Sequence, residues 1–463
     1  MSREDAITGI EVYFDNGEFY NDLSRRIAIP STSQDADKRP ALYAYLDEEI
    51  GPCLKDMGYE VSRHENPDPA GGPLLIAERH EGNDLNTVLT YGHGDVVRGH
   101  EGKWREGRSP WALEKDGDRW YGRGTADNKG QHSINIAALA QVLKTRGSLG
   151  FNSRILIETS EETGSAGLRE FCAGHRDALS ADVLIGSDGP RLRPDAPTLF
   201  MGTRGAINFE LSINLREGGH HSGNWGGLLT SASIRLANAI STIVDKKGRI
   251  LVAGLKPEKI PDSIRKALQN CDIDGGEGAP EIDPDWGEPG LTPAEQVFAW
   301  NSFEVLAMKA GDPEKVVNAV PPRATAWCQI RFTVDRDPNM FLSVIRDHLD
   351  SQGFDDVEVG QEEDGFMMQA TRLLPDHPWV EWAAASLENT MKKPPVILPN
   401  LGGSLPNDVF SDVIGMPTIW IPHSYAACSQ HAPNEHVLAP MMREGLQIMT
   451  GLFWDMGAGQ TPK

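Results

Sequence analysis

Short runs of consecutive apolar residues recur along the first 200 residues of the chain and once more near its end. The runs occupy residues 74–77, 88–91, 155–157, 183–185 and 418–421. Continuous apolar runs of this length are typical of strands that are buried on both faces. Helical spacing is seen at Leu42, Leu46, Ile50 and Leu54, and at Ile134, Ala137, Ala138 and Val142. The alternation predicts an α/β fold with a mixed, largely parallel sheet flanked by helices.

The middle of the chain follows a different period, in which every second residue is apolar. This alternation runs from Ile207 to Leu215 and again from Ala324 to Val334. It is the pattern of a strand with one buried face, and a helical repeat follows each of the two strands. The two strand–helix units predict a small α+β domain whose sheet is open on one face.

These patterns divide the chain of 463 residues, which is long for a single core. We expect a first domain at residues 1–203, an inserted domain at 204–375, and a return to the first domain at 376–463. Residues 275–290 are rich in glycine, proline and acidic residues, so they are expected to form a loop within the insertion. The insertion would cover the first domain as a lid.

Acidic residues outnumber basic ones by 67 to 44, which gives a formal net charge of −23. Such a charge repels nucleic acids and anionic membranes, so neither is expected as a partner. No apolar run approaches the roughly 18 residues of a membrane-spanning helix. The first residues lack the basic-then-apolar pattern of a secretory signal. The five cysteines are scattered without a C-x-x-C pair, which favours reduced thiols and a cytoplasmic location.

Residues that can bind metal ions follow several of the apolar runs. They are His93, Asp127, Glu161, Glu162, Asp188 and His431, of which Asp127 precedes a helical repeat. The carboxyl ends of neighbouring parallel strands meet at one edge of a sheet, where ligands bind. Singly, each residue has an ordinary explanation, such as a loop histidine, an Asp-Gly turn or a solvated acidic pair. Together they predict a site for two divalent ions, because imidazoles and carboxylates are ligands of catalytic zinc.

The same stretches resemble the motifs of a known enzyme family. The motifs are Gly92-His93-Gly94-Asp95, Gly122-Arg123-Gly124, Asp127-Asn128-Lys129-Gly130, Glu161-Glu162-Thr163-Gly164, Ser187-Asp188-Gly189-Pro190 and His431-Ala432-Pro433-Asn434-Glu435. In this order they resemble the dizinc peptidase family that includes carnosinase, cytosolic non-specific dipeptidase, aminoacylase and glutamate carboxypeptidase. Three further motifs resemble the carnosinase-like branch of this family: Gly202-Thr203-Arg204-Gly205, His221-Ser222-Gly223 and Gly402-Gly403-Ser404.

The resemblance implies a role for each ligand. Asp127 would bridge both ions, with His93 and Asp188 completing the first. Glu162 and His431 would complete the second ion. A shared carboxylate holds two ions about 3.5–4 Å apart, the spacing at which one hydroxide bridges them. The ions would be zinc, with manganese or cobalt as alternatives.

Two further acidic residues receive roles in this scheme. Asp95 would accept the second N–H of the His93 imidazole and fix its tautomer, although a turn cap is the alternative. Glu161 would be the general base, because adjacent side chains point apart and its neighbour binds metal. It would take a proton from the bridging water and pass it to the leaving amine.

The remaining site residues come from the expected lid and from the loop near residue 403. By resemblance, His221 would stabilise the tetrahedral oxyanion, with His220 as the competing assignment. Arg331 lies on the non-apolar face of its strand, where its guanidinium suits a substrate carboxylate; a surface salt bridge is the alternative. Asn318, Gly403 and Ser404 match substrate-contacting positions. In dimeric relatives the lid histidine comes from the neighbouring subunit, which implies a homodimer.

The function that follows is a metal-dependent hydrolase that cleaves the amide bond of dipeptides or small aminoacyl amides. An alternative keeps the chemistry and changes the substrate, as an amidohydrolase or deacylase acting on N-acyl, N-carbamoyl or aryl amides. A third interpretation is a metal or peptide binder without catalysis. The presence of Glu161 beside a full set of ligands argues against a binder, which needs no base.

Overall fold

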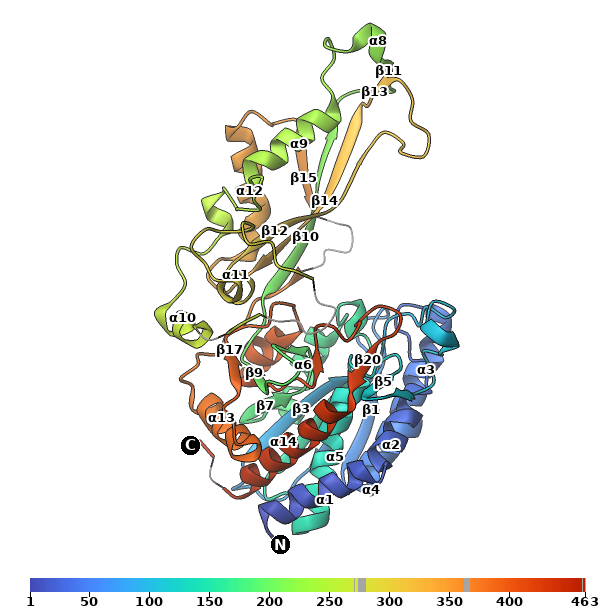
Figure 1. Ribbon diagram of the computed structural model, residues 1–463, viewed down its shortest axis with the longest axis vertical. Helices are drawn as coiled ribbons and strands as arrows, with labels where there is room; N and C mark the ends of the chain where they lie inside the picture. Colours follow the sequence, from blue (N-terminus) through green and yellow to red (C-terminus); the bar gives the residue numbers. More distant parts are fainter. Residues whose placement is uncertain (270, 274–279, 362–366, 460, 463) are drawn as a thin grey trace.

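The computed structural model describes the whole chain except residues 270, 274–279, 362–366, 460 and 463. Two large sheets lie in different parts of an elongated molecule (Figure 1). The sheet of eight strands lies near both termini, and a second sheet of five strands projects away from it.

The eight-stranded sheet has the order β1-β2-β6-β3-β7-β18-β9-β17. Its strands are β1 (Glu60–His64), β2 (Leu74–Arg79), β3 (Thr87–His93), β6 (Asn152–Glu158), β7 (Val183–Gly186), β9 (Thr198–Phe200), β17 (Val396–Leu398) and β18 (Thr418–Trp420). β3 pairs in parallel with β6 and with β7, and β7 pairs in parallel with β18. β1 and β2 are antiparallel at one edge. All five strands predicted from apolar runs are present in this mixed sheet.

Alternate residues of the central strands enter two separate hydrophobic cores. On β6, Ile155 and Ile157 pack in the first core, and Leu156 between them packs in the second. On β3, Val88 belongs to the first core and Leu89 to the second. Apolar side chains are therefore required on both faces, which explains why these strands read as continuous apolar runs.

Helices cover both faces of this sheet (Figure 1). The first core is covered by α1 (Arg3–Asp15), α2 (Glu18–Ile27), α4 (Gly51–Asp56), α5 (Lys129–Arg146), α13 (Pro378–Met391) and α14 (Ala439–Gly457), and by the π-helical segment Tyr45–Ile50 that follows α3 (Arg39–Ala44). The second core is covered by α6 (Leu168–Gly174), α7 (Arg176–Leu179), α10 (Asp262–Leu268) and α11 (Pro293–Ala299).

The second sheet is antiparallel, with the order β12-β14-β10-β15 and with β16 also paired to β10. Its elements are β10 (Gly205–Asn214), β12 (Ser302–Ala310), β14 (Arg323–Phe332), β15 (Val357–Gln361) and β16 (Met367–Met368), with α9 (Ala232–Ile243) and α12 (Phe341–Ser351). The apolar residues of β10 and β14 face these two helices in a third core. The predicted α+β lid is present, and the predicted fold class is confirmed.

The segment predicted as an insertion also contacts the eight-stranded sheet. Ile264 of α10 and Phe298 of α11 pack in the second core of that sheet. Of the predicted loop, residues 280–290 contain no helix or strand, and residues 275–279 lie outside the described residues. The domain limits at residues 203 and 375 stay a prediction.

Short elements complete the fold. They are β4 (Glu114–Asp116), β5 (Arg119–Tyr121), β8 (Pro190–Arg191), β11 (His220–His221), α8 (Ser222–Trp225), β13 (Ala319–Val320), β19 (Ser424–Tyr425) and β20 (His436–Leu438). Among the described residues, no helix is both long and apolar enough to cross a membrane. All five cysteines are free, and the cytoplasmic location stays a prediction.

Candidate metal centre

Three adjacent parallel strands deliver candidate ligands to one end of the eight-stranded sheet. His93 is the last residue of β3, the middle strand of the three. β6 ends at Glu158, and a single 3₁₀ turn follows at Glu161–Thr163. β7 ends at Gly186, two residues before Asp188. The carboxyl ends of these strands therefore gather the ligands as predicted.

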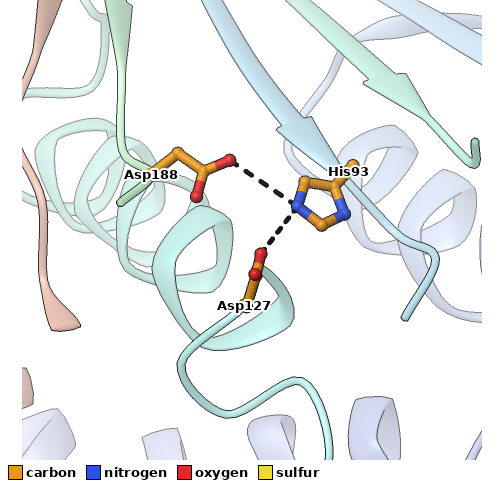
Figure 2. A group of neighbouring side chains, drawn as sticks. All are labelled: His93, Asp127 and Asp188. Atoms are coloured by element: carbon orange, nitrogen blue, oxygen red, sulfur yellow. Dashed lines mark hydrogen bonds and ion pairs between the residues drawn. The ribbon is translucent and has the colours of Figure 1, made fainter. Parts of the chain in front are cut away.

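Asp127 approaches the same place from the start of α5. Its neighbour Asn128 donates its side-chain N–H to the main-chain oxygen of Ser187, at 2.8 Å, which ties the two ligand loops together. The first ligand group forms where these loops meet β3 (Figure 2). His93 Nε2 lies 2.9 Å from Asp127 Oδ1 and 3.6 Å from Asp188 Oδ2.

The second ligand group shares Asp127 with the first. His431 Nε2 lies 3.0 Å from Asp127 Oδ2 and 2.9 Å from Glu162 Oε2. The two oxygens of one carboxylate thus face the imidazoles of two different groups. This is the arrangement that a carboxylate bridging two metal ions requires.

Two oxygens of the ligand groups have no hydrogen-bond partner. They are Glu162 Oε1 and Asp188 Oδ2, both inaccessible to solvent. Unpaired buried oxygens cost free energy, because their hydration is lost without compensation. Divalent ions bind such oxygens directly, so the residues present fit a pair of metal ions.

The pKa values of the centre show how strongly its charges interact. Burial, followed by the charge of Asp127, raises the pKa of Asp188 to about 6 and that of Glu162 to about 7. Burial alone would lower the pKa of His93, but hydrogen bonds to Asp127 and Asp95 raise it well above its usual range. Several buried carboxylates within a few ångströms create a strong demand for positive charge, which metal ions meet.

Asp95 contacts both His93 and the turn that holds the two glutamates. His93 Nδ1 lies 3.1 Å from the main-chain oxygen of Asp95 and 3.4 Å from its carboxylate Oδ1. The Asp95 carboxylate accepts the main-chain N–H groups of Glu161 and Glu162, at 3.2 and 3.1 Å. It therefore positions the acidic turn as well as the imidazole.

Glu161 lies beside the first group without belonging to it. Its Oε2 is 4.0 Å from His93 Nε2, and its side chain lines a cavity of about 410 Å³ next to the ligands. Burial, the main influence, and the neighbouring carboxylates raise its pKa well above the usual range of a glutamate. A carboxylate with a raised pKa at the edge of a cavity has the properties of a general base.

Two residues predicted to contact substrate meet where the lid joins the rest of the molecule. Arg331 of β14 donates from Nη1 to Ser404 Oγ at 2.8 Å. Ser404 and Gly403 also line the cavity that contains the ligands. The described partners of the Arg331 guanidinium are the neutral side chains of Gln329 and Ser404, so the alternative of a surface salt bridge is not seen among the described residues.

His221 and Asn318 are not brought to the metal centre within one chain. They lie at the far end of the lid, on and beside the paired strands β11 and β13 (Figure 1). Both residues are exposed, and His221 Nδ1 accepts the main-chain N–H of Gly223 at 3.1 Å. His220 lies at the same tip, against Trp225.

Glu435, for which no role was predicted, holds two ligand loops together. Its fully buried carboxylate accepts the main-chain N–H groups of Gly124, Ala126 and Asp127 at 2.9 to 3.1 Å. Its other oxygen accepts Arg123 Nη1 at 2.6 Å. The glycine-rich loop before Asp127 was a signal in the sequence for this role, because main-chain N–H groups that point inward in such a loop need an anion.

We predict that Glu435→Gln weakens metal binding by about 10- to 100-fold, because it removes the charge that fixes the Asp127 loop. Titration of the metal-free protein with zinc against a competing chelator measures the affinity. Glu48→Gln, at an exposed position, is the matched control. An affinity equal to that of the unchanged protein would contradict the role of Glu435.

The arrangement agrees with comparisons to known proteins. The model of peptidase family M20/M25/M40 matches residues 89–455. The chain is 30% identical to the cysteinylglycine-S-conjugate dipeptidase of Corynebacterium striatum over 287 residues, which are 60% of each chain. It is 24% identical over 402 residues to the human beta-Ala-His dipeptidase, and this match covers 83% of the chain and 77% of that protein.

Solved structures share the fold over the whole length. Human carnosine dipeptidase 1 has a TM-score of 0.80 at 21% identity, covering 98% of this chain and 99% of that one. Dug1p of Saccharomyces cerevisiae has a TM-score of 0.80 at 20% identity, with 100% of both chains covered. The family match extends across both candidate ligand groups and confirms the resemblance seen in the motifs. The chain belongs to peptidase family M20/M25/M40 and is a metallopeptidase of that family.

Proposed function

We propose that this protein is a dipeptidase that uses two divalent metal ions to hydrolyse the amide bond of small peptides. The observation that carries the proposal is the pair of ligand groups sharing Asp127 beside a cavity that also contains Glu161. The relatives support the substrate class, since the Corynebacterium striatum and human proteins are dipeptidases.

In this proposal five residues hold the ions. His93 and Asp188 hold one, Glu162 and His431 hold the other, and Asp127 contacts both. When bound, the ions would polarise the scissile carbonyl and lower the pKa of a water molecule. Zinc is the expected metal, and manganese and cobalt suit the same mixture of imidazole and carboxylate ligands.

Glu161 moves the proton. Its carboxylate lies at the wall of the cavity, near the first ligand group but outside both groups. It takes a proton from the attacking water at a carboxylate oxygen and gives it to the nitrogen of the leaving amine. Asp95 keeps the Glu161–Thr163 turn in place during both proton transfers, because its carboxylate accepts the main-chain N–H groups of Glu161 and Glu162.

Arg331 and Ser404 anchor the substrate. The guanidinium lies half-buried without a described carboxylate partner, and it reaches the cavity wall through Ser404. A planar guanidinium suits a carboxylate, so the free C-terminus of a dipeptide is the expected ligand. Gly403 lies next to Ser404 in the same wall and leaves room for the substrate backbone.

His221 and Asn318 act in the site of a second copy. Their place at the far end of the lid supports this, because they can reach a metal centre only across an interface. Exposed apolar side chains surround them, including Trp225, Val316 and Val317. Such side chains favour burial against another protein surface. We therefore propose a homodimer in which His221 stabilises the oxyanion of the partner's reaction.

We predict that the metal-loaded protein hydrolyses free dipeptides. A panel of dipeptides, N-acetyl amino acids, N-carbamoyl amino acids and anilides, followed by amine release, measures the preference. The dipeptides should give the highest kcat/KM, because they offer both an aminoacyl amide and a free carboxylate. Rapid deacylation without dipeptide turnover would instead establish the amidohydrolase alternative.

We predict that Glu161→Gln lowers kcat on the order of 10²-fold or more, since the amide cannot accept the proton. Metal content, measured by elemental analysis, should stay unchanged because Glu161 belongs to neither ligand group. Glu170→Gln on α6, an exposed substitution of the same kind, should leave kcat as it is. Unchanged turnover in Glu161→Gln would remove the general base from the mechanism.

We predict that inactive His221→Ala and Glu161→Gln proteins regain activity when they are mixed and allowed to exchange subunits. A mixed dimer then has one site with both residues intact. After random exchange of equal amounts, roughly a quarter of all sites are intact, so the activity should reach roughly a quarter of that of the unchanged protein. Light scattering confirms the dimer, and self-mixed samples of each variant are the controls. If His221 acted within its own chain, every site would lack one group and mixing would restore nothing.

A further inference from the structure

The cavity beside the ligand groups has an apolar wall. It is lined at one end by Asp127, Glu161, Asp188 and His431. The rest of the wall is made largely of Leu192, Val297, Phe298, Leu398, Leu401 and Leu405. These side chains come from the loop after β8, from α11, and from the segment between β17 and residue 405. The five side chains other than Val297 are largely buried and belong to the second hydrophobic core.

Charged groups in this wall are already neutralised. Among the described lining residues outside the ligand groups and Glu161, the charged one is Arg191. Its guanidinium forms an ion pair with Glu444 and donates to the main-chain oxygen of Pro422 at 3.1 Å. Gln430, another polar lining residue, donates to Asp127. Arg191 Nη2 has no hydrogen-bond partner among the described residues, but the charge of this guanidinium is already balanced by Glu444. The rest of the apolar wall offers no described charged group that could compensate a charged substrate side chain.

The place of the carboxylate anchor decides which substrate residue meets this wall. Ser404, which accepts the hydrogen bond of Arg331, lines the same cavity beside Leu401 and Leu405. When Arg331 and Ser404 bind the C-terminal carboxylate of a dipeptide, the α-carbon of the C-terminal residue lies beside Leu401 and Leu405. The side chain on this carbon then extends along the apolar wall, and the scissile amide lies toward the ligand groups.

We infer that the protein selects dipeptides whose C-terminal residue has a large apolar side chain, such as leucine or phenylalanine. This inference depends on the proposed dipeptidase function and on its carboxylate anchor. Burial of an apolar side chain against Leu398, Leu401 and Phe298 is favourable. Burial of a charged side chain in the same place loses its hydration without a partner.

The test compares Ala-Leu, Ala-Phe, Ala-Gly, Ala-Asp and Ala-Lys on the metal-loaded protein. We expect kcat/KM for Ala-Leu and Ala-Phe to exceed that for Ala-Gly by about 10- to 200-fold. Ala-Asp and Ala-Lys should be poorer substrates than Ala-Gly. Equal efficiencies across the series, or a preference that follows the N-terminal residue in Leu-Ala and Ala-Ala, would overturn the inference while leaving the dipeptidase proposal intact. If no dipeptide is hydrolysed, the proposed function fails and this inference fails with it.

A positive charge introduced at Val297 tests substrate specificity separately from folding. Val297 lines the cavity but is 36% exposed, so a lysine there keeps its stem against the wall and its ammonium in solvent. Val297→Lys should raise the ratio of kcat/KM for Ala-Asp over Ala-Leu by about 10-fold or more. The ratio is independent of the fraction of folded enzyme. Val12→Lys on α1, where the valine is 50% exposed, is the matched control. An unchanged ratio in Val297→Lys would overturn the assignment of the wall.

Discussion

The mutual repulsion of buried carboxylates is the constraint around which the site is built. Asp127, Glu162 and Asp188 lie within one small region together with Glu161, and two imidazoles are their nearest cationic partners. Packing alone does not hold such a cluster, because each carboxylate loses hydration on burial. Asp95 and Glu435 hold the loops that carry the ligands, because their carboxylates accept main-chain N–H groups of Glu161 and Asp127. Metal ions would supply the charge that these hydrogen bonds leave unbalanced.

The fold places these side chains close together because a parallel sheet brings residues that are distant in sequence to one edge. β6, β3 and β7 are neighbours, so their carboxyl ends deliver an acidic turn, an imidazole and an aspartate side by side. The remaining ligands, Asp127 and His431, come from loops outside this sheet, which the pairing of β5 with β20 brings side by side. Glu435 and Arg123 also join the two loops through buried hydrogen bonds. Strand ends thus place three parts of the centre, and hydrogen-bonded loops place Asp127 and His431.

The sequence predicted the strands and the candidate ligands, but two features that form only where distant segments meet were missed. Continuous apolar runs identified the central strands because both faces of the sheet are buried, as Ile155 and Leu156 illustrate. Residue type and position after those runs suggested the candidate ligands, and the resemblance to the family motifs assigned a role to each of them. The buried role of Glu435 was missed because the glycine-rich loop signals a need for an anion without showing which distant carboxylate meets it. The apolar cavity was missed for a similar reason, because α11 and the segment near Leu401 meet only in the folded chain.

The order of the ligands along the chain also affects biosynthesis. Asp127 and His431, which face each other across 3.0 Å, are separated by 304 positions, with the whole lid encoded between them. A nascent polypeptide emerging from the ribosome can assemble the His93 cluster early, but its second imidazole arrives only when translation is nearly finished. Cofactor loading is therefore expected to be a late, post-translational event, so truncated translation products would be released without hydrolytic activity.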